Sequence, residues 1–279
     1  MHDAATPGER PAQTFAGQVA IVTGAGRGIG RAEALALALR GASVVVNSRS
    51  TETTAATVAA IREAGGKAIE AAGDVADDET VRAIVERTVA TFGRLDILVN
   101  NAGAGAEFMN RDVETMPFAH WDRIHATHLR ATYVFCHHAI APMRARGHGR
   151  IVNTSSMHGL GGGRAGIANY TSAKAGVMGL TRNLAKEVGP HGITANAVAP
   201  GFIHTEFFDT YPREFIAQIE RQNPLNRLGR PDEVAELVCF LASPQAAYIN
   251  GAIIPIDGGR QEYAIEPVRR AEAGEERLR

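Results

Sequence analysis

A tyrosine and a lysine, Tyr170 and Lys174, stand four residues apart in the stretch NYTSAKAG. Four residues make about one turn of an α-helix, so both side chains would leave the same helix face. A free phenol has a pKa of about 10 and exchanges protons poorly near neutral pH. A cation one turn away favours the phenolate and lowers that pKa. The pair therefore predicts an acid/base group, with an ordinary surface pair as the alternative.

Two adjacent serines, Ser155 and Ser156, end the apolar run that precedes this pair. A serine hydroxyl can hold a substrate oxygen in place while charge develops on it. A hydroxyl, a phenol and an ammonium group brought together would suit proton transfer at a substrate oxygen.

Short apolar runs and longer helix-forming segments alternate along most of the chain. The runs are mostly apolar throughout rather than alternating, which is typical of strands buried on both faces. Strands are expected at 18–22, 42–47, 67–72, 95–100, 150–155, 193–198 and 252–257, and helices at 28–40, 51–64, 77–92, 121–146, 168–189 and 231–242. This order predicts a single α/β domain in which a parallel sheet lies between helices. Ligands of such sheets bind at the carboxyl ends of the strands.

The composition is that of an ordinary soluble protein. The 279 residues include 29 basic and 30 acidic ones, with a formal net charge of -1, which gives no bulk attraction to nucleic acid or to a membrane surface. The chain lacks a run of 18 apolar residues and a signal-peptide pattern, so we expect a cytoplasmic protein. We expect a loose leader at 1–16, one cofactor-binding and catalytic domain at 17–260, and a charged tail at 261–279. Cys136 and Cys239 are expected to be reduced, buried thiols.

A glycine-rich turn, TGAGRGIG at 23–30, follows the first expected strand and opens the first helix. Its spacing departs from the G-x-G-x-x-G fingerprint. The same physics applies, because glycines let the backbone approach a pyrophosphate and the helix N-terminus offers free amide groups. The turn predicts a dinucleotide site that includes Gly24, Gly28, Ile29 and Gly30.

The end of the second strand indicates the cofactor. An NAD site usually has an acidic residue there that binds the ribose 2′-hydroxyl, whereas an NADP site has cationic residues that bind the 2′-phosphate. The chain instead has the uncharged Asn47 and Ser48, followed by Arg49, and Arg27 lies in the glycine turn. Two guanidinium groups suit a phosphate, so we expect NADP(H), with NAD(H) as the alternative.

Four motifs stand in one order along the chain: the glycine turn, NNAG at 100–103, the Ser and Tyr-x-x-x-Lys set, and PGFIHT at 200–205. In this order they resemble the short-chain dehydrogenase/reductase family, classical type, over about residues 17–260. The resemblance implies a Rossmann-like, doubly wound sheet of about seven strands and hydride transfer between a nicotinamide and a carbonyl or alcohol. It also implies dimers or tetramers.

The same resemblance implies roles for individual residues. Tyr170 would be the acid/base, Ser156 would orient the substrate oxygen, and Lys174 would hold the nicotinamide ribose and tune Tyr170. With the glycine turn, Arg27, Ser48 and Arg49, the expected cofactor contacts are Asp74 and Val75 at adenine, Asn101, Ala102 and Gly103 along the ribose side, Tyr170 and Lys174, and Pro200, Gly201, Ile203 and Thr205 near the carboxamide.

Two departures from the family pattern affect the site. Fourteen residues rather than the usual 13 separate Ser156 from Tyr170, so Ser155 is an alternate orienting serine. His128 stands where many members have an asparagine that joins a water-linked proton path to the lysine. An imidazole can also donate and accept, so His128 is a candidate for this relay, with a packing histidine as the alternative.

The expected substrate pocket comprises Met157, His158, Phe202 and Phe207, and the segment 202–228 is a candidate lid or subunit contact. The favoured substrate is a fairly apolar small carbonyl compound or secondary alcohol. A 3-oxoacyl or 3-hydroxyacyl thioester is the alternative, suggested by the HLR stretch at 128–130 and by Arg182. A binding protein that senses NADP without chemistry is the alternative from another class. No metal site is expected, because His137 and His138 are adjacent and point to different helix faces.

Overall fold

The computed structural model describes residues 13–161 and 163–260. Its seven strands form one parallel sheet with the order β3-β2-β1-β4-β5-β6-β7. The strands are β1 (Val19–Val22), β2 (Ser43–Val46), β3 (Lys67–Glu70), β4 (Ile97–Asn100), β5 (Gly149–Thr154), β6 (Ile193–Pro200) and β7 (Ile253–Ile256). The order reverses between β1 and β4, which makes their carboxyl ends the usual ligand site of such a sheet. The prediction of a doubly wound parallel sheet is confirmed.

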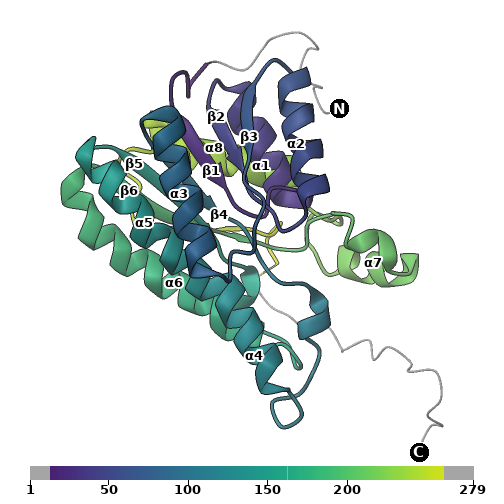
Figure 1. Cartoon of the computed structure of the whole chain (residues 1–279). Helices are drawn as coiled ribbons and strands as arrows, with labels where there is room; N and C mark the ends of the chain where they lie inside the picture. The colour runs from purple at the N-terminus through teal and green to yellow at the C-terminus, as the bar shows by residue number, and fades with distance from the viewer. Residues whose placement is uncertain (1–12, 162, 261–279) are drawn as a thin grey trace, which may run out of the picture.

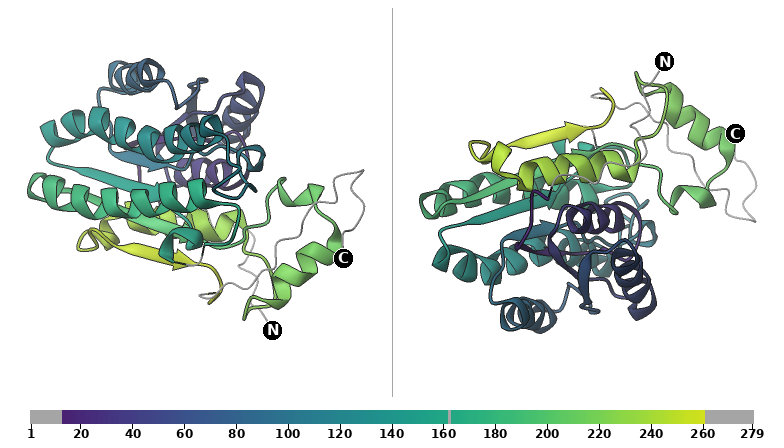
Figure 2. Two further views of the ribbon diagram at one scale, coloured as in Figure 1. Left: turned by 90° about the horizontal axis from the view of Figure 1, so that it is seen from below. Right: turned by 90° about the horizontal axis from the view of Figure 1, so that it is seen from above.

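Helices cover both faces of the sheet (Figures 1 and 2). The described helices are α1 (Gly28–Leu39), α2 (Thr51–Glu63), α3 (Asp78–Phe92), α4 (Phe118–His125), α5 (Ala131–Ala145), α6 (Ala168–Val188), α7 (Arg213–Arg221) and α8 (Pro231–Ala242). Residues of α1, α2 and α8 form one apolar layer with the sheet, and residues of α3, α5 and α6 form the other. The inner strands β1, β4, β5 and β6 are buried on both faces for this reason, as their apolar runs predict, whereas the edge strands β3 and β7 keep exposed residues.

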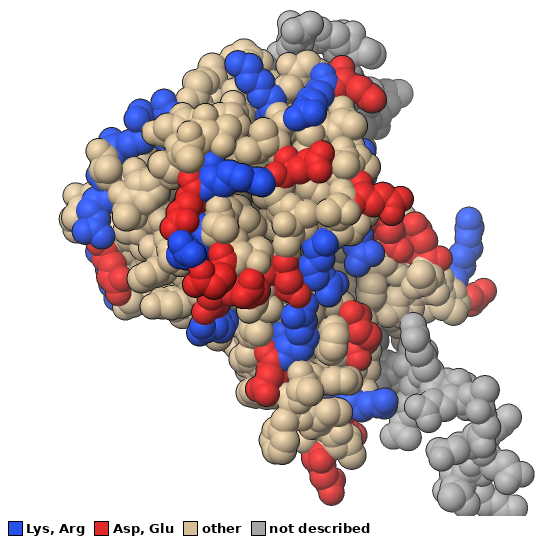
Figure 3. Space-filling model, viewed as in Figure 1, with Lys and Arg blue, Asp and Glu red and all other residues tan. Residues whose placement is uncertain are grey.

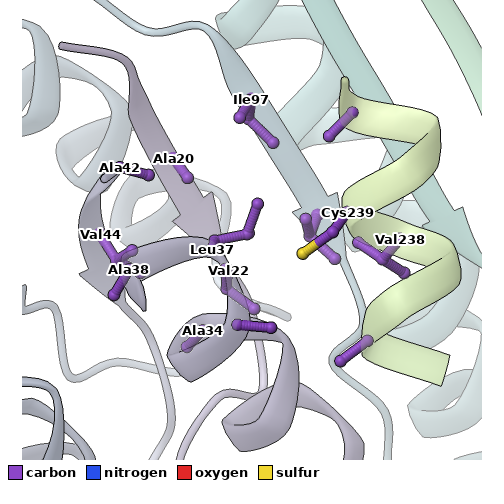
Figure 4. Packing of buried hydrophobic residues seen from close by; sticks show 14 of the residues in the cluster. Ala20, Val22, Ala34, Leu37, Ala38, Ala42, Val44, Ile97, Val238 and Cys239 are labelled. Atoms are coloured by element: carbon purple, nitrogen blue, oxygen red, sulfur yellow. The ribbon is translucent and has the colours of Figure 1, made fainter. Parts of the chain in front are cut away.

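The layer between α1 and α8 is built from small and branched side chains. Ala34 and Leu37 of α1 pack in one cluster with Val238 and Cys239 of α8 and with Ile97 of β4 (Figure 4). All five residues are buried, and the same helix α1 begins in the glycine turn.

Local capping explains why several helices begin and end where the sequence predicts. The Ser50 hydroxyl accepts a hydrogen bond from the Thr53 amide at the start of α2, and Asp77 does the same for Thr80 at the start of α3. Helix α3 ends at Gly93, whose φ of 73° is a left-handed conformation that glycine adopts without strain.

The structure differs from the expected elements in three places. The helix expected at 121–146 is divided by a π-helical turn, Ala126–Arg130, between α4 and α5. The segment 202–228 contains a helix, α7, which stands away from the layers in Figure 1. Phe15, expected in the leader of residues 1–16, is fully buried against the core, whereas residues 1–12 and the tail at 261–279 lie outside the described residues.

Acidic and basic side chains are interspersed on the face seen in Figure 3, which carries no large patch of one sign. Within the described part of the chain, no helix combines the length and apolarity that a membrane crossing requires.

Candidate active site

The tyrosine and lysine of the opening motif lie in the first turns of α6, at the carboxyl edge of the sheet. The Lys174 ammonium group donates a hydrogen bond of 2.6 Å to the Thr154 carbonyl oxygen at the end of β5. It lies 5.8 Å from the centroid of the Tyr170 ring. Lys174 is only 4% exposed and Tyr170 is partly buried, so the alternative of an ordinary surface pair does not fit.

The two candidate serines have different surroundings. The Ser155 hydroxyl has a structural role, since it donates a 2.8 Å hydrogen bond to the backbone oxygen of Lys174. The Ser156 hydroxyl acts on the phenol of Tyr170, whose pKa it lowers, and accepts a hydrogen bond from the His158 amide at 3.2 Å. The structure thus brings Ser156 to the phenol and uses Ser155 to fix β5 against α6.

Burial dominates the electrostatics of this pair. It raises the pKa of Tyr170, and the hydrogen bond with Ser156 acts in the opposite direction. It lowers the pKa of Lys174 to about 7, although the charge of Glu33 acts to raise it. The lowering of the Tyr170 pKa that the sequence predicts is therefore not seen in this structure, because desolvation of both groups outweighs their proximity.

His128 lies in the π turn and faces the same site. Its Nε2 accepts a 3.0 Å hydrogen bond from the Ala104 amide, so in the neutral ring Nδ1 carries the proton. Burial, and then the charge of Lys174, hold the pKa of His128 well below its usual range, so the ring is neutral at pH 7. The ring meets Tyr170 edge-on at 5.2 Å, and Nδ1 has no hydrogen-bond partner among the described residues. A π turn at this position agrees with the frequent occurrence of such turns at functional sites.

The glycine of the NNAG motif leaves room for the His128 ring. A Cβ atom on Gly103 would lie 2.3 Å from Cε1 of His128, so a side chain is excluded there. The adjacent Ala102 and Asn101 amides both donate to the Thr23 hydroxyl at 3.0 Å, which ties the end of β4 to the start of the glycine turn.

The glycine turn fits a dinucleotide. Gly24 and Gly28 have φ values of 66° and 54°, which L-residues rarely adopt. A Cβ on Gly30 would lie 2.4 Å from Nδ2 of Asn101, and the turn opens α1 with free backbone amides, as a pyrophosphate requires. Ile29 lies within this turn and packs against the core layer of α1 and α8.

The expected adenine end lies beside β2 and α3. The Ser48 hydroxyl is hydrogen-bonded to Thr54 at 2.7 Å, and a Cβ on Gly26 would approach it to 2.8 Å, so the end of β2 touches the glycine turn. Arg27 and Arg49 are exposed, and no salt bridge joins either to a described carboxylate.

Asp74 and Val75 follow β3. Burial acts to raise the pKa of Asp74. Hydrogen bonds from the Ala76 amide and Arg123, together with the charges of Arg123 and Arg49, outweigh burial, so the pKa is lowered overall and the carboxyl is ionised at neutral pH. The Val75 side chain is buried in the core.

The segment after β6 crosses in front of the glycine turn. A Cβ on Gly28 would lie 3.1 Å from Cγ2 of Thr205, and a cavity of about 330 Å³ separates α1 from residues 204–209. Pro200 ends β6, and Gly201 packs so closely on Asp257 that a Cβ would come within 2.8 Å. Ile203 is 5% exposed and belongs to the core.

Aromatic rings connect the phenol to the expected lid. The His158 ring lies 6.3 Å from Tyr170 and 6.0 Å from Phe202, and the Phe202 ring lies 6.0 Å from Phe208. Phe207 meets the Phe208 ring edge-on at 5.4 Å and is 46% exposed, whereas Met157 is buried.

Several residues of the site are not evident in the sequence. Arg260 lies 4.7 Å above the Phe202 ring and is 2% exposed, at the end of the described chain. Asn153 links β4 to α6 through hydrogen bonds with Asn100 and Thr181. Glu33 is fully buried in α1 although it interrupts a run of alanine and leucine. None of these residues is part of a recognisable spacing, and only the topology reveals them.

No group of three or more His, Cys, Asp or Glu side chains able to hold a metal ion occurs among residues 13–161 and 163–260. His137 and His138 lie edge to face on α5, with 5.0 Å between ring centroids.

Known proteins are similar to this chain in both sequence and fold. A family model described as enoyl-(acyl carrier protein) reductase matches residues 24–261. A short-chain reductase protein, NovJ, of Streptomyces niveus is 43% identical over 252 residues, which are 87% of this chain and 93% of that protein. A 3-oxoacyl-[acyl-carrier-protein] reductase of Synechocystis is 43% identical over 245 residues, 87% of this chain and 96% of the relative. The crystal structure of levodione reductase superposes with a TM-score of 0.84 at 36% identity and covers 88% of this chain and 98% of its own.

The chain therefore belongs to the short-chain dehydrogenase/reductase family, of the classical type. It is an NAD(P)-dependent oxidoreductase that acts between a carbonyl and an alcohol.

Proposed function

We propose that this protein is an NADP-dependent reductase or dehydrogenase that interconverts a carbonyl and a secondary alcohol on a fairly apolar small molecule. The observation that carries the proposal is the set at the end of β5, where the buried Ser156 and Lys174 meet the partly buried Tyr170 and the Lys174 ammonium group donates a 2.6 Å hydrogen bond to the Thr154 carbonyl oxygen. When bound, the nicotinamide supplies or accepts the hydride. The protein moves the accompanying proton.

Each member of the set has a distinct role. Ser156 holds the substrate oxygen beside the phenol as charge develops on it. Tyr170 gives its proton to that oxygen during reduction and takes one during oxidation. Lys174, in its charged form, stabilises the phenolate and binds the nicotinamide ribose.

NADP(H) is the preferred cofactor in this proposal. Arg49, Arg27 and Ser48 lie where the end of β2 meets the glycine turn. No salt bridge joins either guanidinium to a described carboxylate, although the charge of Arg49 acts on Asp74, and a 2′-phosphate would take both guanidinium groups as bidentate partners. NAD(H) is the alternative, and a comparison of NADPH and NADH binding decides between them.

His128 is proposed as the proton relay behind Lys174. Its neutral ring, with Nδ1–H directed away from the bond to Ala104, can pass a proton through a water molecule. An asparagine amide offers a donor and an acceptor too, so the substitution by histidine preserves the chemistry that the relay needs.

The pocket favours an apolar substrate because the side chains described around it are largely aromatic. The His158 ring lies next to Tyr170 and the Phe202 ring next to His158, with Phe207 and Tyr211 further out. Levodione reductase, by its name, acts on a ketone, which agrees with this choice. An acyl thioester is the second candidate, favoured by the relative that is a 3-oxoacyl-[acyl-carrier-protein] reductase and by the exposed Arg182. A sensor without chemistry is disfavoured by the intact catalytic set.

The screen that tests the proposal follows NADPH oxidation and NADP⁺ reduction over ketones, acyl thioesters, steroids, sugars and diols. Tyr170→Phe is the matched control, because it removes one hydroxyl and keeps the ring that packs on His128. We expect turnover of an apolar ketone or its alcohol by the wild type only. Cofactor binding without turnover across the whole panel would favour the sensor instead.

We also propose a cytoplasmic homo-oligomer, a dimer or tetramer. Support comes from a hollow of about 370 Å³ between α5 and α6, which is lined in part by Leu129, Tyr133 and Leu180, with Tyr133 53% exposed. Light scattering of the purified protein tests the assembly, and a monomeric mass would contradict it.

A further inference from the structure

A buried arginine at the end of the described chain has no role in the mechanism given above. Arg260 is 2% exposed, and its guanidinium group lies 4.7 Å above the centroid of the Phe202 ring. It also donates a hydrogen bond to the side-chain oxygen of Gln222, the residue that caps the end of α7. In both views of Figure 2, the yellow end of the described chain lies on the side of the sheet from which the green helix α7 projects. Arg260 therefore joins two parts of the lid segment 202–228, its first residue and the end of its helix.

The Phe202 ring connects this arginine with the catalytic tyrosine. The ring is half-buried and meets the His158 ring edge-on at 6.0 Å, and the His158 ring lies 6.3 Å from that of Tyr170. On its other side the Phe202 ring meets Phe208 edge-on at 6.0 Å and packs against the apolar cluster of the lid segment. A cation within about 6 Å of an aromatic ring centroid is attracted by the negative charge of the ring face. Arg260 thus holds a ring that belongs to the surroundings of the phenol.

Other contacts fasten the base of the lid segment independently of this arginine. The Gly229 amide donates a 2.9 Å hydrogen bond to the Phe202 carbonyl oxygen, which closes the segment at its two ends. The Asn223 side chain donates a 3.1 Å hydrogen bond to the Asp257 carbonyl oxygen just after β7. Neither bond involves the Arg260 side chain, so both remain when that side chain is replaced. Loss of the guanidinium group is therefore expected to release the Phe202 ring without unfolding the lid segment.

We propose that Arg260 is a positioning residue that acts through Phe202: it fixes the ring as an aromatic wall of the substrate pocket near Tyr170. This inference rests on the proposed function, and it specifies the substrate as a carbonyl compound or alcohol with an aromatic or alicyclic ring next to the reacting carbon. A ring of this kind gains apolar contact area and ring packing from a fixed aromatic wall. A small aliphatic ketone contacts little of that wall and gains little from it.

The first measurement follows the Phe202 ring directly and needs no substrate. The chain contains ten phenylalanines, and labelling with 4-fluorophenylalanine makes each of them visible by ¹⁹F NMR, with Phe202→Leu as the assignment of Phe202. Arg260→Met removes the charge and the donors but keeps an unbranched apolar side chain, and Arg260→Lys keeps a cation. Arg230→Met is the matched control, because it removes an exposed arginine just beyond the lid segment that pairs with Asp232.

We expect the Phe202 resonance to shift or broaden in Arg260→Met, to recover in part in Arg260→Lys, and to stay unchanged in Arg230→Met. Gln222→Ala keeps the arginine but removes its acceptor on α7, so it should move the same resonance by less. It takes the place of Arg260→Met if that variant does not fold. A Phe202 resonance that stays in place in the variant so measured overturns the inference.

The second measurement compares a ring-bearing ketone with a small aliphatic ketone from the substrate screen. Arg260→Met should raise KM for the ring-bearing ketone about tenfold with kcat within about twofold, and leave kcat/KM for the small ketone within about twofold. The Kd for NADPH should not change. In a Phe202→Leu background, Arg260→Met should have no further effect on KM, because the ring through which it acts is gone.

Equal losses on both ketones, or additive effects of Arg260→Met and Phe202→Leu, overturn the inference, since either result shows that Arg260 does not act through this ring. A separate result would count against the proposed function. If no carbonyl compound or alcohol is turned over although the Phe202 resonance moves in Arg260→Met, the proposed function is wrong and the placement of Phe202 by Arg260 stands.

Discussion

The pH dependence of stability offers a quantitative check on the buried carboxyl of Glu33. Burial raises its pKa from 4.5 to about 8 in the folded protein. Between these values the folded protein holds a proton on Glu33 that the unfolded chain has lost, so this group makes the protein less stable as pH rises. The expected slope is about 1.4 kcal/mol per pH unit.

In the interval from pH 5 to pH 7, the contribution of Glu33 to stability can be separated from that of Lys174. Burial lowers the pKa of Lys174 from 10.5 to about 7, so its contribution begins above pH 7, where it acts with the opposite sign. Over the two pH units below 7, Glu33 alone is expected to cost about 3 kcal/mol of folding free energy. Glu33→Gln removes this dependence.

Urea unfolding followed by circular dichroism at pH 5, 6 and 7 measures the difference, at one fixed protein concentration because an oligomer's stability depends on it. The stability of Glu33→Gln relative to the wild type should increase by about 3 kcal/mol between pH 5 and pH 7. Glu236→Gln, which removes an exposed carboxyl from the neighbouring helix α8, should follow the wild type. A parallel pH dependence in Glu33→Gln and the wild type would show that Glu33 ionises normally in the fold.

Three further substitutions test the cofactor and catalytic assignments. Arg49→Ala should weaken NADPH binding roughly tenfold to a hundredfold and leave NADH binding unchanged, by fluorescence titration; equal losses for both would contradict a 2′-phosphate contact. Ser156→Ala should lower kcat/KM roughly a hundredfold or more with little change in stability. Ser155→Ala should instead cost about 1 kcal/mol of stability, because it loses the hydrogen bond to the Lys174 carbonyl. The reverse pattern would exchange the roles of the two serines. His128→Ala should lower kcat roughly tenfold to a hundredfold and His128→Asn much less, in steady-state assays with NADPH binding as control; equal activity in all three proteins would exclude the relay.

The sequence predicts most of the architecture because its signals are local. Runs such as VAIV at 19–22 are too apolar for a half-exposed strand, and they are flanked by turns and helix-forming segments. The Tyr170 and Lys174 pair is equally local, since one helical turn fixes their proximity.

The remaining features depend on contacts between distant segments. Nothing near Glu33 in the sequence distinguishes it from a solvated glutamate on an alanine-rich helix, because its burial follows from the packing of α1 on α8 and the sheet. The choice between Ser155 and Ser156 likewise depends on how β5 meets α6, which spacing alone leaves open. The π turn at His128 cannot be predicted from helix periodicity. It places the His128 ring so close to Gly103 that only glycine fits there.

The most direct test of the central claim compares Tyr170→Phe with the wild type in two assays on the same preparations. The first is kcat/KM for the best carbonyl substrate of the screen, and the second is the Kd for NADPH. We expect Tyr170→Phe to lose at least about a hundredfold in kcat/KM while NADPH binds within about twofold of the wild type, because only the transferable proton is removed. Undiminished turnover in Tyr170→Phe would remove Tyr170 from the mechanism and with it the proposed assignment of the site.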